Sequence, residues 1–215
     1  MNCSISISLI FVLLLSGVFP SYAEDSIKPL IYYFHGKILE DQGIDAYSQQ
    51  FGKYEYNKIV DVFRSAGFKV KAEIRSKDCD VQKYADRVAK QIRKEIDSGV
   101  PPSKITLLGG SKGAVIAMAI QNILKESEIN VILLAGMFRT VVNDQNLQLY
   151  GRVLHMYDKS DYMIVDPTEL LKRSKSVRVF KNLSFDLGVK HGFLFRPYSE
   201  WVNPALKWAG AKKSH

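Results

Sequence analysis

The chain has 215 residues, of which 47% are hydrophobic and 24% are charged. This composition excludes a disordered or fibrous chain and suffices for one sizeable hydrophobic core. The formal net charge is +8, but lysine and arginine are spread over predicted helix faces rather than grouped in blocks. We interpret the charge as a solvated basic surface. Attraction to acidic envelope polymers or anionic lipid is the alternative, and no nucleic-acid partner is expected.

Residues 1–23 have the pattern of a secretory signal. An apolar stretch is followed by Ser21–Ala23, a small-x-small sequence, and then by two acidic residues. We predict cleavage after Ala23, which leaves 24–215 as a single domain of a bacterial envelope protein, periplasmic or secreted. Because no Lys or Arg precedes the apolar run, an uncleaved membrane anchor is the alternative, although the run is short for a full span. We expect membrane contact only through this segment. After cleavage, Cys79 is the only cysteine, so no internal disulfide is expected.

Strand-like and helix-like segments alternate along the rest of the chain. The strand-like runs are 30–34, 68–73, 105–108, 130–135, 152–157 and 177–186, and the helix-like runs are 56–66, 80–96, 114–124, 167–173 and 198–208. The clearest helix is 80–96, where apolar residues recur every three or four positions. This alternation predicts an α/β fold with a mainly parallel sheet covered by helices on both faces. Ligands of such sheets bind beyond the carboxyl ends of the strands.

The sequence GGSKG at 109–113 satisfies G-x-S-x-G between a predicted strand and a predicted helix. Its glycines, Gly109, Gly110 and Gly113, allow a sharp turn that projects Ser111 clear of the sheet. The helix that follows directs backbone N–H groups at an oxyanion formed beside the serine. We therefore predict Ser111 as a nucleophile. The alternative is a glycine turn whose serine caps the helix.

A serine nucleophile needs a base, and the chain has four histidines. His191 lies between the last predicted strand and the last predicted helix, from where it can reach across the sheet ends to Ser111. We predict His191 as the base. His155 falls inside a predicted strand, which favours a core or sheet-face residue, and His215, the last residue of the sequence, is expected to be frayed. His35 is expected to brace its own loop by hydrogen bonds.

An acid must orient the imidazole and stabilise the imidazolium, and the loop after strand 152–157 offers three aspartates. Asp166 is better explained by the sequence DPTE, which predicts a helix N-cap, a proline at the first helical position and a capping glutamate. We favour Asp161 as the acid, because it lies three residues beyond the strand end, where a loop carboxylate can turn toward the histidine. Asp158 at the strand end is the alternative, and Asp186 is a third candidate.

The order serine, acid, histidine after successive strands resembles the α/β-hydrolase superfamily. More narrowly, FHGKILEDQG, GKYEY, GVPPSKITLLGGSKGA and LHMYDKSDY look like a group of small bacterial hydrolases of unassigned substrate. The resemblance implies that the backbone of Gly36 or Lys37 supplies one oxyanion donor and the N–H of Lys112 the other. Lys37 stands where the H-G-G-G pattern of the superfamily has a second glycine, so the choice between Gly36 and Lys37 stays open.

The superfamily often inserts a cap after the strand that corresponds to 130–135, but here only 136–151 separates two strands. We therefore expect a minimal fold without a lid domain and a shallow, open site. Such a site suits surface-presented acyl esters, including polymer-linked or lipid-linked ones. Lys37 and Lys112 either favour an anionic substrate or have no such role. Four tyrosines either line the site or pack in the core: Tyr32, Tyr33, Tyr54 and Tyr56.

The sequence thus predicts a serine hydrolase that cleaves a carboxylic ester or thioester through an acyl-enzyme on Ser111. A peptidase or amidase on the same scaffold is one alternative, because a triad alone does not choose the leaving group. A non-catalytic envelope binding protein is the alternative from another class. We expect no cofactor and no metal, since the sequence has no H-E-x-x-H, no Cys/His cluster and no P-loop spacing.

Overall fold

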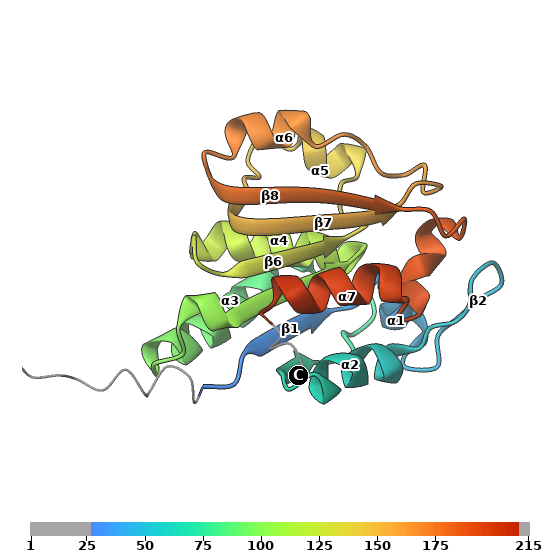
Figure 1. Ribbon diagram of the computed structural model, residues 1–215, viewed down its shortest axis with the longest axis horizontal. Helices are drawn as coiled ribbons and strands as arrows, with labels where there is room; N and C mark the ends of the chain where they lie inside the picture. Colours follow the sequence, from blue (N-terminus) through green and yellow to red (C-terminus); the bar gives the residue numbers. More distant parts are fainter. Residues whose placement is uncertain (1–26, 211–215) are drawn as a thin grey trace, which may run out of the picture.

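The computed structural model describes residues 27–210, which form one six-stranded parallel sheet and a separate two-stranded hairpin (Figure 1). The predicted signal and His215 lie outside this range. Each neighbouring pair in the large sheet is parallel, so the predicted α/β architecture is confirmed. The strands, in spatial order, are β4 (Lys69–Ala72), β1 (Leu30–Phe34), β5 (Ile105–Gly110), β6 (Asn130–Leu134), β7 (Tyr150–Asp158) and β8 (Ser176–Phe185).

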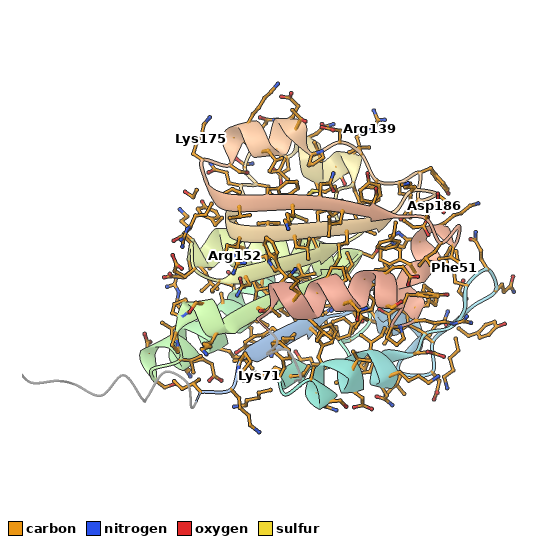
Figure 2. All side chains as sticks on the ribbon, in the orientation of Figure 1. Phe51, Lys71, Arg139, Arg152, Lys175 and Asp186 are labelled. Atoms are coloured by element: carbon orange, nitrogen blue, oxygen red, sulfur yellow. The ribbon has the colours of Figure 1, made fainter. Side chains whose placement is uncertain are left out.

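Helices cover both faces of the sheet, and the sheet separates the hydrophobic core into two clusters (Figure 1). One face packs against α3 (Val81–Asp97), α4 (Lys112–Leu124), α5 (Arg139–Asn143) and α6 (Thr168–Arg173). The other packs against α2 (Tyr56–Ser65) and α7 (Ser199–Trp208). Side chains fill both interlayer spaces (Figure 2). Burial of each large apolar side chain there contributes about 1.5–3 kcal/mol of hydrophobic stabilisation.

The sequence predictions locate every strand of the large sheet and every helix longer than six residues. They miss short elements: α1 (Lys37–Gln42), the hairpin of β2 (Tyr47–Ser48) and β3 (Gly52–Lys53), α5, and the 3₁₀ turns η2 (Pro102–Lys104) and η3 (Lys190–Phe195). One or two turns are too short to show a 3.6-residue period. Helix α6 begins at Thr168, one residue later than expected, although Asp166 Oδ1 does accept a hydrogen bond from the Thr168 N–H at 2.8 Å.

Parallel pairing brings the carboxyl ends of all six strands to one edge of the sheet, which we call the carboxyl edge. The first turn of α1 follows β1 at this edge, and the serine turn follows β5. The aspartate-rich loop follows β7, and η3 follows β8. Four segments that are distant in the chain therefore meet beyond one edge of the sheet, where ligands of parallel sheets bind.

Candidate active site

Ser111 occupies a strained turn between β5 and α4. Its φ is +54° and its ψ is −121°, a conformation that costs a residue with a side chain about 1–3 kcal/mol. Backbone hydrogen bonds hold it there. The Ser111 N–H donates to Leu134 O at 2.9 Å, and Ser111 O accepts from the Ala114 N–H at 2.8 Å. The local geometry is that of a nucleophile elbow, in which strain exposes a serine at the carboxyl edge.

Two of the predicted elbow glycines are required by close backbone approach. A Cβ on Gly109 would lie 2.2 Å from Gly113 O, and a Cβ on Gly113 would lie 1.9 Å from Phe34 O. Backbone atoms cannot rotate away as a flexible side chain can, so only glycine fits at either position. At Gly110, a Cβ would meet only the Leu194 side chain, at 3.2 Å. The start of α4 is therefore packed directly against the end of β1.

His191 and Asp161 are brought into contact. His191 Nδ1 lies 2.6 Å from Asp161 Oδ2, and Asp161 is only 3% exposed. With Nδ1–H donating to the carboxylate, Nε2 is the nitrogen that remains free to accept a proton. Within residues 27–210, neither Ser111 Oγ nor His191 Nε2 has a hydrogen-bond partner. Such bonds are often long before substrate binds and tighten only in the complex.

Asp158 has a different set of partners. Its Oδ1 accepts from the Ser160 N–H and hydroxyl, and its Oδ2 accepts from the Leu187 and Val189 N–H groups at 3.2 and 3.3 Å. Burial raises the pKa of Asp158, but these hydrogen bonds outweigh it and hold the pKa below its ordinary value. Asp158 thus fastens the loop that carries the histidine to the end of β7. Asp186 is exposed and has no hydrogen-bonded side-chain partner in the described part of the chain.

Two further histidines are buried away from this contact. His35 Nδ1 donates to Gly36 O at 2.7 Å and its Nε2 accepts from the Arg75 N–H at 3.0 Å, which braces the loop as expected. Burial, together with the Arg75 charge, lowers the pKa of His35 to about 4. His155 Nδ1 lies 2.8 Å from Asn182 Oδ1, and burial lowers the pKa of His155 to about 4. Neither imidazole is placed to act as a base for Ser111.

The predicted oxyanion donors lie at two helix starts beside the serine. Gly36 precedes α1, Lys37 is the first residue of α1, and Lys112 is the first residue of α4. The first N–H groups of a helix have no acceptor within that helix. A Cβ on Gly36 would lie 3.6 Å from Ser111 Cβ, so the segment after β1 is in van der Waals range of the serine. The choice between Gly36 and Lys37 stays open.

The lysine side chains are already paired. Lys112 Nζ lies 2.6 Å from Glu40 Oε2 and donates to Cys79 O at 2.8 Å, while Lys37 Nζ lies 2.6 Å from Asp41 Oδ1. The Lys112 ammonium is therefore paired with a protein carboxylate, and a preference of the site for an anionic substrate stays a prediction. The four tyrosines are all under 8% exposed and pack in the core, so the alternative that they line the site is wrong.

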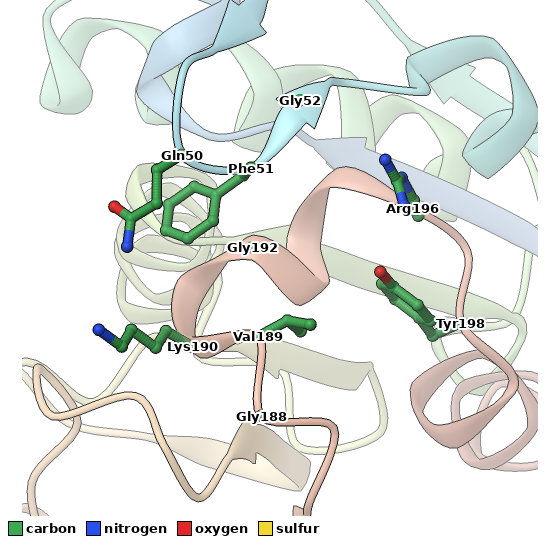
Figure 3. A pocket seen from close by; sticks show the side chains of 9 residues that line it. All are labelled: Gln50, Phe51, Gly52, Gly188, Val189, Lys190, Gly192, Arg196 and Tyr198. Atoms are coloured by element: carbon green, nitrogen blue, oxygen red, sulfur yellow. The ribbon is translucent and has the colours of Figure 1, made fainter.

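A cavity of about 500 Å³ adjoins the segment that carries His191 (Figure 3). Ser111 and His191 do not line it, although Lys190 and Gly192, on either side of His191, do. Among residues 27–210, no three His, Cys, Asp or Glu side chains gather as a set of metal ligands. The walls of the cavity come from the β2–β3 hairpin, from η3 and from the chain on both sides of η3: Gln50, Phe51, Gly52, Gly188, Val189, Lys190, Gly192, Arg196 and Tyr198.

Comparison with known proteins gives matches in structure but not in sequence. No protein-family model and no curated protein matches the chain. A mutant of the esterase E40 superposes with a TM-score of 0.56 at 13% identity, covering 84% of this chain and 77% of the other. A hydrolase-like protein of the α/β superfamily from Xanthomonas campestris superposes with a TM-score of 0.52 at 14% identity, covering 84% of this chain and 99% of the other. A lipase-esterase related protein from Clostridium acetobutylicum gives 0.51 at 15% identity, covering 84% and 95%.

The chain has the α/β-hydrolase fold. Identities this low bear on the fold alone, and chemistry must be argued from the residues. Between β6 and β7, where larger α/β-hydrolase proteins carry a cap, the only helix is the five-residue α5. Sequence reasoning found the serine, histidine and acidic residues of this edge but missed Glu40 and Arg75, which form a buried charged cluster behind the elbow.

Proposed function

We propose that the protein is a serine hydrolase of carboxylic esters or thioesters, with Ser111 as nucleophile, His191 as base and Asp161 as the acid that orients it. The observation that carries the proposal is the 2.6 Å contact between His191 Nδ1 and Asp161 Oδ2. This contact leaves Nε2 as the proton acceptor at the same edge as a strained serine. The esterase and lipase-esterase names of two structural neighbours support an ester substrate.

The reaction follows from these roles. As Ser111 Oγ attacks the carbonyl carbon, its proton passes to His191 Nε2, and Asp161 stabilises the imidazolium. The oxyanion accepts hydrogen bonds from the Lys112 N–H and from that of Gly36 or Lys37. The imidazolium then protonates the leaving alcohol or thiol, which leaves an acyl group on Ser111. Water, deprotonated by His191, attacks this ester and releases the acid and the free serine.

The substrate is expected to be presented on a surface rather than enclosed. The short connection between β6 and β7 supports an open site, which suits acyl groups attached to a polymer or a lipid. We further propose that the chain belongs with small exported bacterial hydrolases, as a single domain released after Ala23. The composition of residues 1–23 supports export. No helix within 27–210 is long and apolar enough to cross a membrane. N-terminal sequencing of the protein recovered from an envelope fraction tests this, and a chain that retains Met1 would contradict cleavage.

Labelling with a fluorophosphonate probe, followed by peptide mapping, tests the chemistry. We expect modification at Ser111 and loss of labelling in Ser111→Ala and His191→Ala. Ser65→Ala is the matched control, because Ser65 is exposed on α2 and away from the carboxyl edge, and it should label like the wild type. If the folded wild-type protein neither labels nor hydrolyses p-nitrophenyl acetate, the hydrolase proposal is wrong, and the binding-protein alternative becomes the better interpretation.

A further inference from the structure

A buried ion-pair cluster lies directly behind the elbow and joins three segments of the chain. The Glu40 side chain is 0% exposed. Its Oε1 accepts from Arg75 Nε at 2.7 Å, and its Oε2 accepts from Lys112 Nζ at 2.6 Å. Glu40 belongs to α1, Arg75 follows β4, and Lys112 begins α4. One carboxylate therefore links the helix that follows the first oxyanion segment to the residue that supplies the second donor.

Arg75 extends this linkage to the loop before α1. Its side chain is fully buried, its Nη2 donates to His35 O, and its backbone N–H donates to His35 Nε2. The guanidinium carbon also lies 5.6 Å from the centre of the Tyr84 ring. The carbonyl and imidazole of His35 are thus both held by Arg75, and Gly36 is the next residue. The position of the His35-Gly36 backbone depends on Arg75, which in turn is fixed by Glu40.

We propose that Glu40 is a positioning residue for the oxyanion site, which holds the segment after β1 and the start of α4 in register through its ion pairs with Arg75 and Lys112. This inference rests on the proposed function. Removal of three charges from water is costly, and well-packed apolar residues would serve stability equally well.

Lys112→Met isolates the side chain, because it keeps the backbone N–H that donates to the oxyanion. We expect kcat for p-nitrophenyl acetate to fall roughly 10-fold to 100-fold with little change in KM, since a displacement near 1 Å costs about that much. Lys112→Arg, which restores a cation in reach of Glu40, should recover most of the loss. Lys71→Met is the matched control, because Lys71 pairs with Glu95 from the middle of β4 and is similarly half-buried.

Affinity for a transition-state analogue separates positioning from plain stability. In Lys112→Met and Glu40→Gln, the inhibition constant of a trifluoromethyl ketone should rise by the same factor as kcat/KM falls. A merely structural role would lower the urea midpoint and leave both constants unchanged in the folded variants, and this result would overturn the inference. Should Lys112→Met fail to fold, Glu40→Asp, which shortens the carboxylate by one methylene, takes its place with the same criteria. If the wild-type protein itself shows no ester hydrolysis, the proposed function is refuted, which is a different outcome from equal activity in the wild type and the variants.

Discussion

Gly113→Ala is expected to damage stability and activity together. A Cβ at this position would lie 1.9 Å from Phe34 O and 2.7 Å from His35 O, whereas real Cβ atoms essentially never come within 3.0 Å of another heavy atom. Helix α4 and the end of β1 must therefore separate by at least about 1 Å. Overpacking usually costs 1–3 kcal/mol, and we expect about 3 kcal/mol or more here because both neighbours are backbone atoms. The same movement separates the two oxyanion segments, so kcat/KM should fall about 100-fold.

Urea unfolding and ester hydrolysis, measured on the same preparation, test this expectation. Gly99→Ala is the control, because Gly99 has a φ of +98° but no heavy atom within 4 Å of an added Cβ. It should lose about 1–2 kcal/mol from backbone strain alone and keep its kcat/KM. A Gly113→Ala protein that is as stable as the Gly99→Ala protein, or that is fully active, would refute the argument that close approach of α4 to β1 builds the site.

Two further predictions concern individual side chains. Asp161→Asn should lower kcat on the order of 10³-fold to 10⁴-fold, because the amide favours the wrong imidazole tautomer. Asp158→Asn should instead lower the free energy of unfolding by about 1–3 kcal/mol and reduce kcat by less than about tenfold. Equal, mild losses of kcat in the two variants would contradict both roles. Burial lowers the pKa of His155 to about 4, from 6.5 ordinarily. Above pH 6.5 the imidazole is neutral in both the folded and the unfolded chain, whereas between pH 6.5 and pH 4 the unfolded chain binds a proton that the folded one does not, so the free energy of unfolding decreases as the pH falls. His155→Gln should therefore remove about 2 kcal/mol of the decline in unfolding free energy between pH 7 and pH 5, and an unchanged decline would contradict the assignment.

The sheet was predictable because its strands are strong local signals. Strand β5 is buried at all six positions and carries no polar side chain except that of Thr106, and α3 repeats apolar residues with the helical period over 17 residues. Strand β8 was predicted as 177–186 although most of it is exposed at the sheet edge. Helices α1 and α5, with six and five residues, give no period to detect. They are fixed by tertiary contacts rather than by their own sequence.

The candidate site was predictable where its residues carry a local pattern. Ser111 has a glycine motif, and the candidate base follows from the position of a histidine after the last strand. Glu40 and Arg75 carry no such pattern, because they are 35 residues apart and Glu40 is 72 residues from Lys112. Only the strand order brings them together. A salt bridge of this kind depends on the packing of α1, which the sequence did not reveal as a helix.

The sequence alone left two candidates for the acid, Asp161 and Asp158, and their contacts in the structure show why. Both carboxylates contact the segment that carries His191, but one binds its backbone and the other contacts the imidazole. Asp158 accepts hydrogen bonds from the backbone N–H groups of Leu187 and Val189 and so holds the loop on which the histidine sits. Asp161 contacts the imidazole itself. A strand-end aspartate is well placed to bind backbone, because the neighbouring parallel strand ends beside it. Asp161, three residues further along, accepts one backbone hydrogen bond through Oδ1, from the Met163 N–H at 3.2 Å, and its Oδ2 contacts the imidazole. The position of each carboxylate relative to the strand end therefore matches the group that it contacts, which is loop backbone for Asp158 and the imidazole for Asp161.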